Sequence, residues 1–360
     1  MSESNQEVAK MGTKVMIVQE EAAKYAELIK EKFPEEVKNG RIEILTYQHQ
    51  SEIKDDQIGD VEIIGTWPVL APWMDKMPKL KWYMTFSSGY DHIIKANFLP
   101  DHVPLINVPG GSGVPIAEFV IGLMLNHTKG FIKLWEYQKE RKFIRLQGGE
   151  LCGKTLGIIG LGGIGREVAK RAKAFDMRVI GTETRQMEIP FVDEVYLAHQ
   201  VKEIFEQSDY VVLCCPETPE TIGMINKESL KWMKPTGYLI NCARGSLIIK
   251  EDLMQALQEK WIDGAANDTF WIKDPVPSYL PPEDVFWDTP NLIITPHVSS
   301  WTNMYAARFG AVFVENIQRH LLGQELINVV KGNKQTFGRG VELHVDSGRN
   351  LYPERQTLSR

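Results

Sequence analysis

The feature that most restricts the fold of this 360-residue chain is the segment Gly160-Leu-Gly-Gly-Ile-Gly165. It follows an apolar run over 155–159 that is typical of a buried strand, and it opens an amphipathic helix. Gly160 allows a tight turn, Gly162 lets the backbone approach a pyrophosphate, and Gly165 lets helix and strand pack closely. The helix N-terminus supplies N–H groups and a positive dipole end to phosphates. In this strand–turn–helix context the motif predicts dinucleotide binding rather than a purely structural turn.

An acidic residue about 20 positions after the first glycine normally accepts hydrogen bonds from the adenosine ribose. Glu183 lies 23 positions after Gly160, at the end of a second predicted strand. A carboxylate there accepts bonds from two hydroxyl groups and repels a 2′-phosphate, which favours NAD over NADP. Arg185 could bind that phosphate instead, so NADP stays possible.

Short strand patterns alternate with helical patterns along the chain, which predicts parallel sheets built from β-α-β units. The predicted strands cover 14–18, 42–45, 62–64, 80–84, 155–159, 178–180, 210–215, 238–241, 264–266 and 292–295, and amphipathic helices are predicted over 22–32 and 304–322. The nearly continuous apolar strands after residue 150 predict a sheet covered on both faces. About 150 residues with their own βα pattern precede the glycine motif, so we expect a second domain and a ligand cleft between the two.

Composition excludes several classes of partner and site. The net charge of −6 leaves no basic field for nucleic acid, and the apolar stretch 118–125 is far shorter than the roughly 20 residues of a membrane span. The acidic N-terminal residues are unlike a secretory signal. The four cysteines lack metal or redox spacing, which indicates reduced thiols in a cytoplasmic protein and no metal site.

Six ordered sequence blocks resemble the D-isomer-specific 2-hydroxyacid dehydrogenase family over residues 60–330. They are Leu80-Lys-Trp with Ser87-Ser-Gly-Tyr-Asp-His92, Asn107-Val-Pro-Gly110 with Ile116-Ala-Glu118, Gly153-Lys-Thr-Leu-Gly-Ile-Ile-Gly-Leu-Gly-Gly-Ile-Gly165, Asn241-Cys-Ala-Arg-Gly245, Gly264-Ala-Ala-Asn-Asp268 and Thr295-Pro-His297. The resemblance implies an α/β fold with two domains, each a parallel sheet with flanking helices. A larger Rossmann doubly wound NAD-binding domain, 108–297, would be inserted into a smaller flavodoxin-like substrate-binding domain, 1–107 and 298–330, with a tail over 331–360.

The family's activity would be NAD(P)-dependent interconversion of a 2-oxo acid and its D-2-hydroxy acid. The resemblance assigns Arg244 to the substrate carboxylate and carbonyl, because a guanidinium fork binds a carboxylate with two bonds. It assigns His297 as the general acid and base, a task that suits the ordinary pKa of imidazole. His92 is the closest competing histidine.

The third catalytic member in the family is a carboxylate that orients the histidine. A lysine occupies its usual position here, and Asp274-Pro275 follows one residue later. A one-residue insertion would restore the role to Asp274. Glu283 or Asp284 could replace it, or the histidine could lack a carboxylate partner.

The remaining site residues also follow from the resemblance. The residues predicted to bind the cofactor are Gly160, Gly162, Gly163, Ile164, Gly165, Glu183, Arg185, Pro216, Thr221, Cys242, Ala243 and Asp268. Those predicted to bind the substrate are Ser88, Gly89, Tyr90 and Trp301. Aromatic residues in these segments favour an apolar or aromatic 2-oxo acid, although they could equally pack between domains.

The region 119–142 resembles the segment through which family members dimerise, and an internal core helix is the alternative. A non-catalytic, NAD(H)-sensing corepressor of the same fold is the runner-up function. A formate-oxidising relative would carry a Gln partner for the histidine, and no Gln occurs between Asp268 and Pro275.

Overall fold

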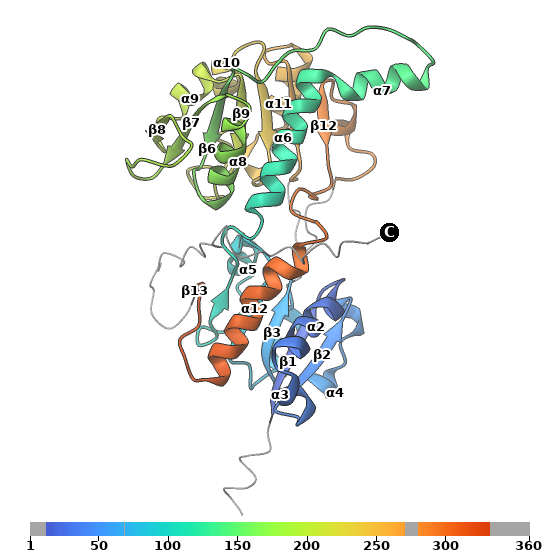
Figure 1. Cartoon of the computed structure of the whole chain (residues 1–360), viewed down its shortest axis with the longest axis vertical. Coiled ribbons are helices and arrows are strands. Elements are labelled where there is room, and N and C mark those ends of the chain that lie inside the picture. Colours follow the sequence, from blue (N-terminus) through green and yellow to red (C-terminus); the bar gives the residue numbers. More distant parts are fainter. Residues whose placement is uncertain (1–11, 68, 271–279, 332–360) are drawn as a thin grey trace, which may run out of the picture. The chain divides into compact units, whose positions relative to one another are not determined.

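The computed structural model describes residues 12–67, 69–270 and 280–331 (Figure 1). These residues form two compact units. Unit 1 comprises the described residues of Met1–Gly111 and Ala306–Arg360, and unit 2 comprises those of Ser112–Tyr305. The tail expected over 331–360 lies outside the described residues from 332 onward.

Unit 1 is built on a six-stranded sheet with the order β13-β5-β4-β3-β1-β2. Its strands are β1 (Thr13–Val18), β2 (Ile42–Tyr47), β3 (Val61–Thr66), β4 (Trp82–Thr85), β5 (Leu105–Ile106) and β13 (Val329–Lys331). Strands β1 to β5 are parallel and follow the flavodoxin-like order 2-1-3-4-5. Strand β13 adds an antiparallel edge beside β5.

The helices of unit 1 are α2 (Ala22–Lys32), α3 (Pro34–Lys38), α4 (Asp55–Ile58), α5 (Asp91–Ala96) and α12 (Tyr305–Leu321). Helix α12 covers one sheet face, where Phe313 meets Trp82 and Phe86 edge to face, at ring centroid distances of 5.6 and 5.3 Å. The packing is so close that a Cβ at Gly65 would lie 2.7 Å from the Phe313 ring. Burial of these aromatic rings therefore joins a C-terminal helix to an N-terminal sheet.

Unit 2 is built on a seven-stranded parallel sheet with the order β12-β11-β10-β9-β6-β7-β8. Its strands are β6 (Thr155–Ile159), β7 (Arg178–Glu183), β8 (Glu194–Leu197), β9 (Tyr210–Leu213), β10 (Tyr238–Asn241), β11 (Gly264–Asn267) and β12 (Leu292–Ile294). Counted from β6, the first six strands follow the Rossmann order 3-2-1-4-5-6, and β12 extends the sheet. The doubly wound fold predicted for this part is confirmed.

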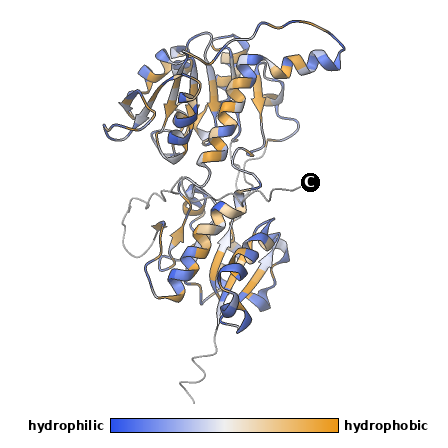
Figure 2. Ribbon diagram, viewed as in Figure 1, coloured by the Kyte–Doolittle hydropathy of each residue, from blue (hydrophilic) through white to orange (hydrophobic). Residues whose placement is uncertain are grey.

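The strands of unit 2 are largely hydrophobic (Figure 2), and their side chains are buried in two cores, one on each face of the sheet. The helices are α6 (Gly113–Lys129), α7 (Phe131–Lys139), α8 (Gly163–Lys173), α9 (Val201–Gln207), α10 (Lys227–Trp232) and α11 (Lys250–Gln258). Helices α6 and α8 pack on one face against Val212 and Ile240. Helices α9, α10 and α11 cover the other face, against Val211 and Leu239. The alternation of neighbouring side chains between two cores explains the continuous apolar strands.

Candidate active site

One row of residues ends the central strands of unit 2. The register places Ile159, Leu213, Asn241, Asn267 and Ile294, the last residues of five parallel strands, level with one another. The segments that follow them all leave the sheet at its carboxyl edge. Ligands of open α/β sheets bind at this edge, so the predicted residues that follow these strands share one region.

The glycine motif forms the turn between β6 and α8. Gly160 has a φ of +99°, and a Cβ there would lie 2.8 Å from the Cys215 backbone nitrogen. A Cβ at Gly165 would lie 2.2 Å from the Gly160 carbonyl oxygen. Both positions therefore require glycine, for backbone conformation and for close packing.

Gly162 differs, because a Cβ built on it meets nothing within 4 Å. It is the residue that precedes α8, and Arg166 N–H donates to its carbonyl oxygen. The first turn of α8, which includes Gly163 and Ile164, contains no acidic residue. Open space in front of a helix N-terminus fits the pyrophosphate of a dinucleotide.

Glu183 ends β7 and is half-buried. Its Oε1 atom accepts hydrogen bonds from the Thr184 backbone N–H at 2.7 Å and the Thr184 hydroxyl at 3.0 Å. Within the described part of the chain, Oε2 accepts no hydrogen bond, so it is available to a ribose hydroxyl. Arg185 lies two residues on and is exposed.

Arg244 follows β10 on a turn fixed by two buried amides. Asn241 Nδ2 donates to the Arg244 carbonyl oxygen and to Asn267 Oδ1, both at 3.0 Å, and Asn241 Oδ1 accepts from Ala243 N–H at 3.1 Å. Asn267 Nδ2 in turn donates to the Thr269 carbonyl oxygen at 2.6 Å. Asn267, where family members carry an apolar residue, thus completes a hydrogen-bond network that supports the Arg244 turn.

Asp268 and His297 are joined through the backbone after β12. Asp268 is 1% exposed, and its Oδ1 accepts from the Thr295 hydroxyl at 2.6 Å and from Val298 N–H at 3.0 Å. Its Oδ2 accepts from Ser299 N–H at 3.0 Å. His297, between these donors, has a φ of +55°, a left-handed conformation that costs a non-glycine residue about 1–3 kcal/mol. Sequence reasoning placed Asp268 at the cofactor and did not foresee this contact.

Four further predicted cofactor residues lie on the segments after β9 and β10. The Thr221 hydroxyl donates to the Pro216 carbonyl oxygen at 2.8 Å, which closes a loop after β9. Cys242 and Ala243 are buried between Asn241 and Arg244, and burial raises the pKa of the Cys242 thiol well above its ordinary value. The Ser246 hydroxyl donates to Glu217, a contact between the two segments that sequence reasoning missed.

The predicted substrate loop lies in unit 1, after β4. The Ser88 hydroxyl donates to the Val108 carbonyl oxygen at 2.9 Å, and Asn107 Nδ2 donates to the Ser88 carbonyl oxygen at 2.7 Å. Gly89 follows Ser88, and Tyr90 directly precedes α5 and packs against the core of unit 1. The loop is therefore held by its own unit.

Trp301 belongs to unit 2, is 42% exposed and packs against Tyr305 with a centroid distance of 4.8 Å. Asp274 lies outside the described residues. Of the alternatives to Asp274, Asp284 accepts from Lys250 Nζ and Phe286 N–H and caps a short 3₁₀ helix over Val285–Asp288, while Glu283 is exposed. Asp284 therefore has a structural role in this unit.

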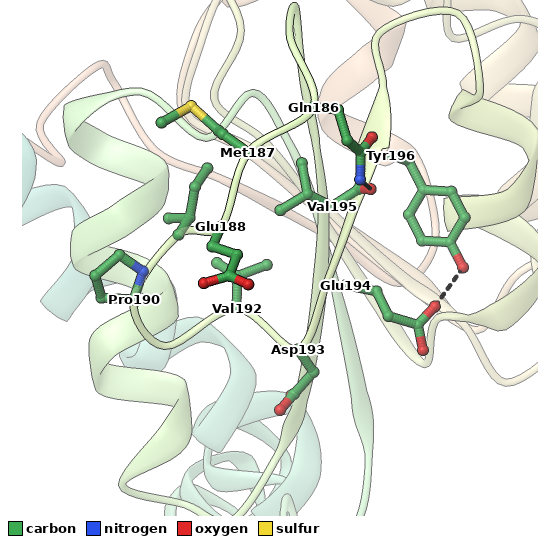
Figure 3. Close-up of a pocket in the computed structure, with 10 residues that line it drawn as sticks. Gln186, Met187, Glu188, Pro190, Val192, Asp193, Glu194, Val195 and Tyr196 are labelled. Carbon is green, nitrogen blue, oxygen red and sulfur yellow. Dashed lines mark hydrogen bonds between the residues drawn. The ribbon is translucent and has the colours of Figure 1, made fainter.

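A pocket of about 900 Å³ lies between the β7–β8 connection and β8 (Figure 3). Two of its three acidic side chains are paired: Glu194 accepts from Tyr196 and Arg178, and Asp193 accepts from Lys173 and Val179 N–H. None of the predicted site residues lines it. We therefore assign it no ligand.

The described residues contain no group of three or more His, Cys, Asp or Glu side chains placed to hold a metal ion. None of the described helices combines the length and the apolar character needed to cross a membrane.

Comparisons with known proteins agree with this fold. Residues 121–299 match the family model described as D-isomer specific 2-hydroxyacid dehydrogenase, NAD binding domain. Glyoxylate reductase of Thermofilum pendens is 34% identical over 261 residues, which cover 71% of this chain and 76% of the relative. Glyoxylate reductase of Thermococcus onnurineus is 31% identical over 328 residues, which cover 87% of this chain and 92% of the relative.

A solved structure gives the same result for the fold. A D-isomer specific 2-hydroxyacid dehydrogenase family protein from Aeromonas salmonicida superposes with a TM-score of 0.80 at 30% identity, over 89% of this chain and 99% of that protein. With relatives above 30% identity matched over most of their length, the chain belongs to the D-isomer-specific 2-hydroxyacid dehydrogenase family, a family of NAD(P)-dependent oxidoreductases.

Proposed function

We propose that this protein reduces a 2-oxo acid to its D-2-hydroxy acid with NADH, and catalyses the reverse oxidation, through Arg244 and His297. The observation that carries the proposal is the order of three adjacent strands in unit 2. Arg244 follows β10, Asp268 follows β11 and His297 follows β12, and all three strands end in one row. A carboxylate-binding cation and a titratable ring thus leave the same sheet edge as the glycine turn.

The chain's own residues supply binding and proton transfer. The Arg244 guanidinium would bind the substrate carboxylate with two charge-assisted bonds and polarise the adjacent carbonyl. His297 would donate a proton to the carbonyl oxygen during reduction and accept one during oxidation. The bound nicotinamide would supply or accept the hydride. We retain Asp274 as the proposed carboxylate partner of His297.

We further propose that unit 2 is the NAD-binding domain and unit 1 the substrate-binding domain. The proposed cofactor residues are the glycine turn with Glu183, Arg185, Pro216, Thr221, Cys242, Ala243 and Asp268. Ser88, Gly89, Tyr90 and Trp301 would contact the substrate. A preference for NAD follows from Glu183, whose carboxylate would repel a 2′-phosphate.

The size of the 2-oxo acid that the enzyme would accept is open to two proposals. The relatives named glyoxylate reductase suggest a small 2-oxo acid, whereas Tyr90 and Trp301 favour an apolar or aromatic one. The deciding experiment assays glyoxylate, hydroxypyruvate, a branched-chain 2-oxo acid and phenylpyruvate with NADH and with NADPH, by absorbance at the nicotinamide band. We expect turnover with NADH and a D-configured product.

The non-catalytic alternative gives a different result. A corepressor-like protein would bind NADH, measured by fluorescence titration, without consuming it with any 2-oxo acid. The chain retains Arg244 and His297, and its relatives above are named as reductases, so this alternative is not favoured.

We also propose a homodimer formed through the arm, defined as α7 and the segment 140–150. Helix α7 has no buried residue and extends away from the other helices of unit 2 (Figure 1). The arm exposes seven large apolar side chains: Phe131, Ile132, Leu134, Trp135, Phe143, Ile144 and Leu146. Many exposed large apolar side chains on one short segment are typical of a protein–protein interface, and twofold homodimers are the commonest oligomers.

Light scattering coupled to gel filtration tests the dimer. The wild-type chain should show twice its own mass, and the Phe131→Glu/Trp135→Glu variant should show the mass of one chain. Phe191→Glu is the matched control, because Phe191 is also exposed in unit 2 but lies outside the arm. A monomeric wild type would contradict the proposal.

We also propose a cytoplasmic location for the protein. Its four cysteines form no disulfide, as is usual for proteins kept in a reducing compartment.

A further inference from the structure

We infer that Asp268 is a positioning residue for His297, because its carboxylate fixes the backbone turn that carries the imidazole. This inference rests on the proposed role of His297 in proton transfer. It assigns Asp268 a task that is distinct from the predicted contact with the cofactor.

The contacts of Asp268 enclose His297 on both sides. The Thr295 hydroxyl donates from two positions before the histidine, and the N–H groups of Val298 and Ser299 donate from one and two positions after it. All three bonds are 2.6–3.0 Å long. A single side chain therefore holds both ends of a five-residue turn.

The Asp268 residue that accepts these bonds is itself held in place by the sheet. Asp268 directly follows β11, and its N–H donates to the Asn241 carbonyl oxygen at 2.9 Å, on the neighbouring strand β10. Its side chain is buried, so solvent does not compete for these bonds. Hydrogen bonds from backbone N–H groups to a buried carboxylate are among the stronger ones in proteins.

The turn needs this restraint. His297 has a left-handed φ of +55°, and its N–H donates to the Thr295 carbonyl oxygen at 2.9 Å. A non-glycine residue leaves such a conformation unless its surroundings hold it. Without the carboxylate, the turn would relax toward ordinary backbone angles and the imidazole would move with it. Small displacements of a proton-transfer group reduce the rate strongly.

The two tasks of Asp268 use different atoms. Oδ1 accepts two hydrogen bonds, which occupy both of its lone pairs, and both come from the turn. Oδ2 accepts one bond, from Ser299, and keeps one acceptor position for a donor on the cofactor. Thr295 therefore offers a way to weaken the turn through Oδ1 while Oδ2 keeps its acceptor position for the proposed contact with the cofactor.

The experiment compares Thr295→Val, which lacks the hydroxyl in nearly the same volume, with Thr295→Ser, which keeps it. We expect Thr295→Val to lower kcat roughly 10-fold, with the Kd of NADH changed by less than about 2-fold. Thr295→Ser should retain kcat within about 3-fold of wild type. Rescue by serine distinguishes the hydroxyl–carboxylate bond from a general packing effect.

Two kinetic results would overturn the inference. One is an unchanged kcat in Thr295→Val. The other is a weakened NADH affinity with an unchanged kcat at saturating NADH, which would confine this contact to cofactor binding.

Hydrogen exchange gives a readout that does not depend on turnover. In the cofactor-free protein, the amides of Val298 and Ser299 should be protected, and Asp268→Asn and Thr295→Val should accelerate their exchange at least about 10-fold. If the wild type reduces none of the 2-oxo acids, the proposed function fails, and exchange still decides whether the carboxylate holds the turn. Equal exchange in wild type and both variants would refute it.

Discussion

His127 Nε2 lies 2.7 Å from Asp263 Oδ2, and the other ring nitrogen of His127 lies 3.0 Å from the Tyr210 hydroxyl. The same hydroxyl is 2.6 Å from the Thr128 hydroxyl, and the imidazole stacks on the Tyr238 ring at a centroid distance of 4.2 Å. Tyr210 and Tyr238 begin β9 and β10, and Asp263 directly precedes β11. This network therefore ties the end of α6 to the amino edge of the sheet, opposite Arg244 and His297.

Tyr210→Phe should lower stability without changing catalysis. The Tyr210 hydroxyl is buried between His127 and Thr128, and its removal leaves both without this partner, at a cost of about 1–3 kcal/mol. For a unit of this size, that corresponds to roughly 2–4 °C in Tm per kcal/mol. Calorimetry and steady-state assays measure the two effects. Tyr196→Phe, which removes a hydroxyl bonded to exposed Glu194, is the control and should shift Tm less.

The same hydroxyl gives a pH-dependent result. Burial raises the pKa of Tyr210 above its ordinary value of about 10, although the bond to Thr128 opposes part of that effect. The unfolded chain therefore releases this proton first, and the folded state loses stability as the pH rises above about 10. Tyr210→Phe has no hydroxyl to titrate, so the Tm difference between wild type and variant should become smaller above about pH 10. A constant difference across this range would contradict the assignment.

The sequence predicted the fold of unit 2 because its signals are local. Each central strand is a run of apolar residues buried on both faces, and the glycine turn needs residues that lack a Cβ. Strands β5, β8 and β13 were missed. They have two, four and three residues and lie at or beside sheet edges, so their apolar runs are too short to indicate a strand. Pairing with a neighbour, rather than local composition, defines them.

Only the site residues that lie in recognisable sequence motifs were predicted. Resemblance named Arg244, Asp268 and His297, and their strands end in one row. The hydrogen bonds around them, from Asp268 to Thr295, Val298 and Ser299, were not predictable, because they depend on which backbone N–H meets which side chain after folding. Asn267 was not among the predicted site residues, and its bonds to Asn241 and Thr269 give it a part in supporting the Arg244 turn.

Glu183→Gln should relax the preference for NAD. The variant keeps a hydrogen-bond acceptor at the end of β7 but removes the charge that would face a 2′-phosphate. We expect the ratio of kcat/KM for NADPH to that for NADH to rise roughly 10- to 100-fold, as for loss of one charge repulsion near the surface. Glu188→Gln is the matched control, because Glu188 is exposed on the connection that follows β7. An unchanged ratio would remove Glu183 from the ribose site.

Arg244→Ala should abolish most activity through loss of substrate binding. Truncating one partner of a buried charge pair costs about 2–5 kcal/mol, which is roughly 30- to 5000-fold in kcat/KM. Guanidinium ions added to the variant should restore part of the rate. Arg178→Ala is the control. Arg178, the first residue of β7, donates a hydrogen bond to Glu194, and its removal should leave kcat/KM unchanged. Equal losses in both variants would indicate a general effect of charge.

His297→Asn should lower the chemical rate, by roughly 10²–10⁴-fold if the imidazole is the general acid. The affinity for NADH should be unaffected, because His297 is proposed to transfer a proton to the substrate and is not one of the proposed cofactor-binding residues. His92→Gln is the informative comparison, since His92 on α5 is the closest competing histidine. Near-normal turnover in His297→Asn, or a larger loss in His92→Gln, would transfer the acid role to another group.

The thiols should divide into one reactive and three inert groups. Cys152 is exposed, whereas burial raises the pKa of Cys215 to about 11 and raises the pKa values of Cys214 and Cys242 further. A raised pKa lowers the population of thiolate, which is the reactive form. A disulfide reagent should therefore titrate one thiol per native chain rapidly and all four after unfolding. Cys152→Ser should abolish the rapid phase, and a rapid phase that persists would place a second thiol at the surface of unit 2.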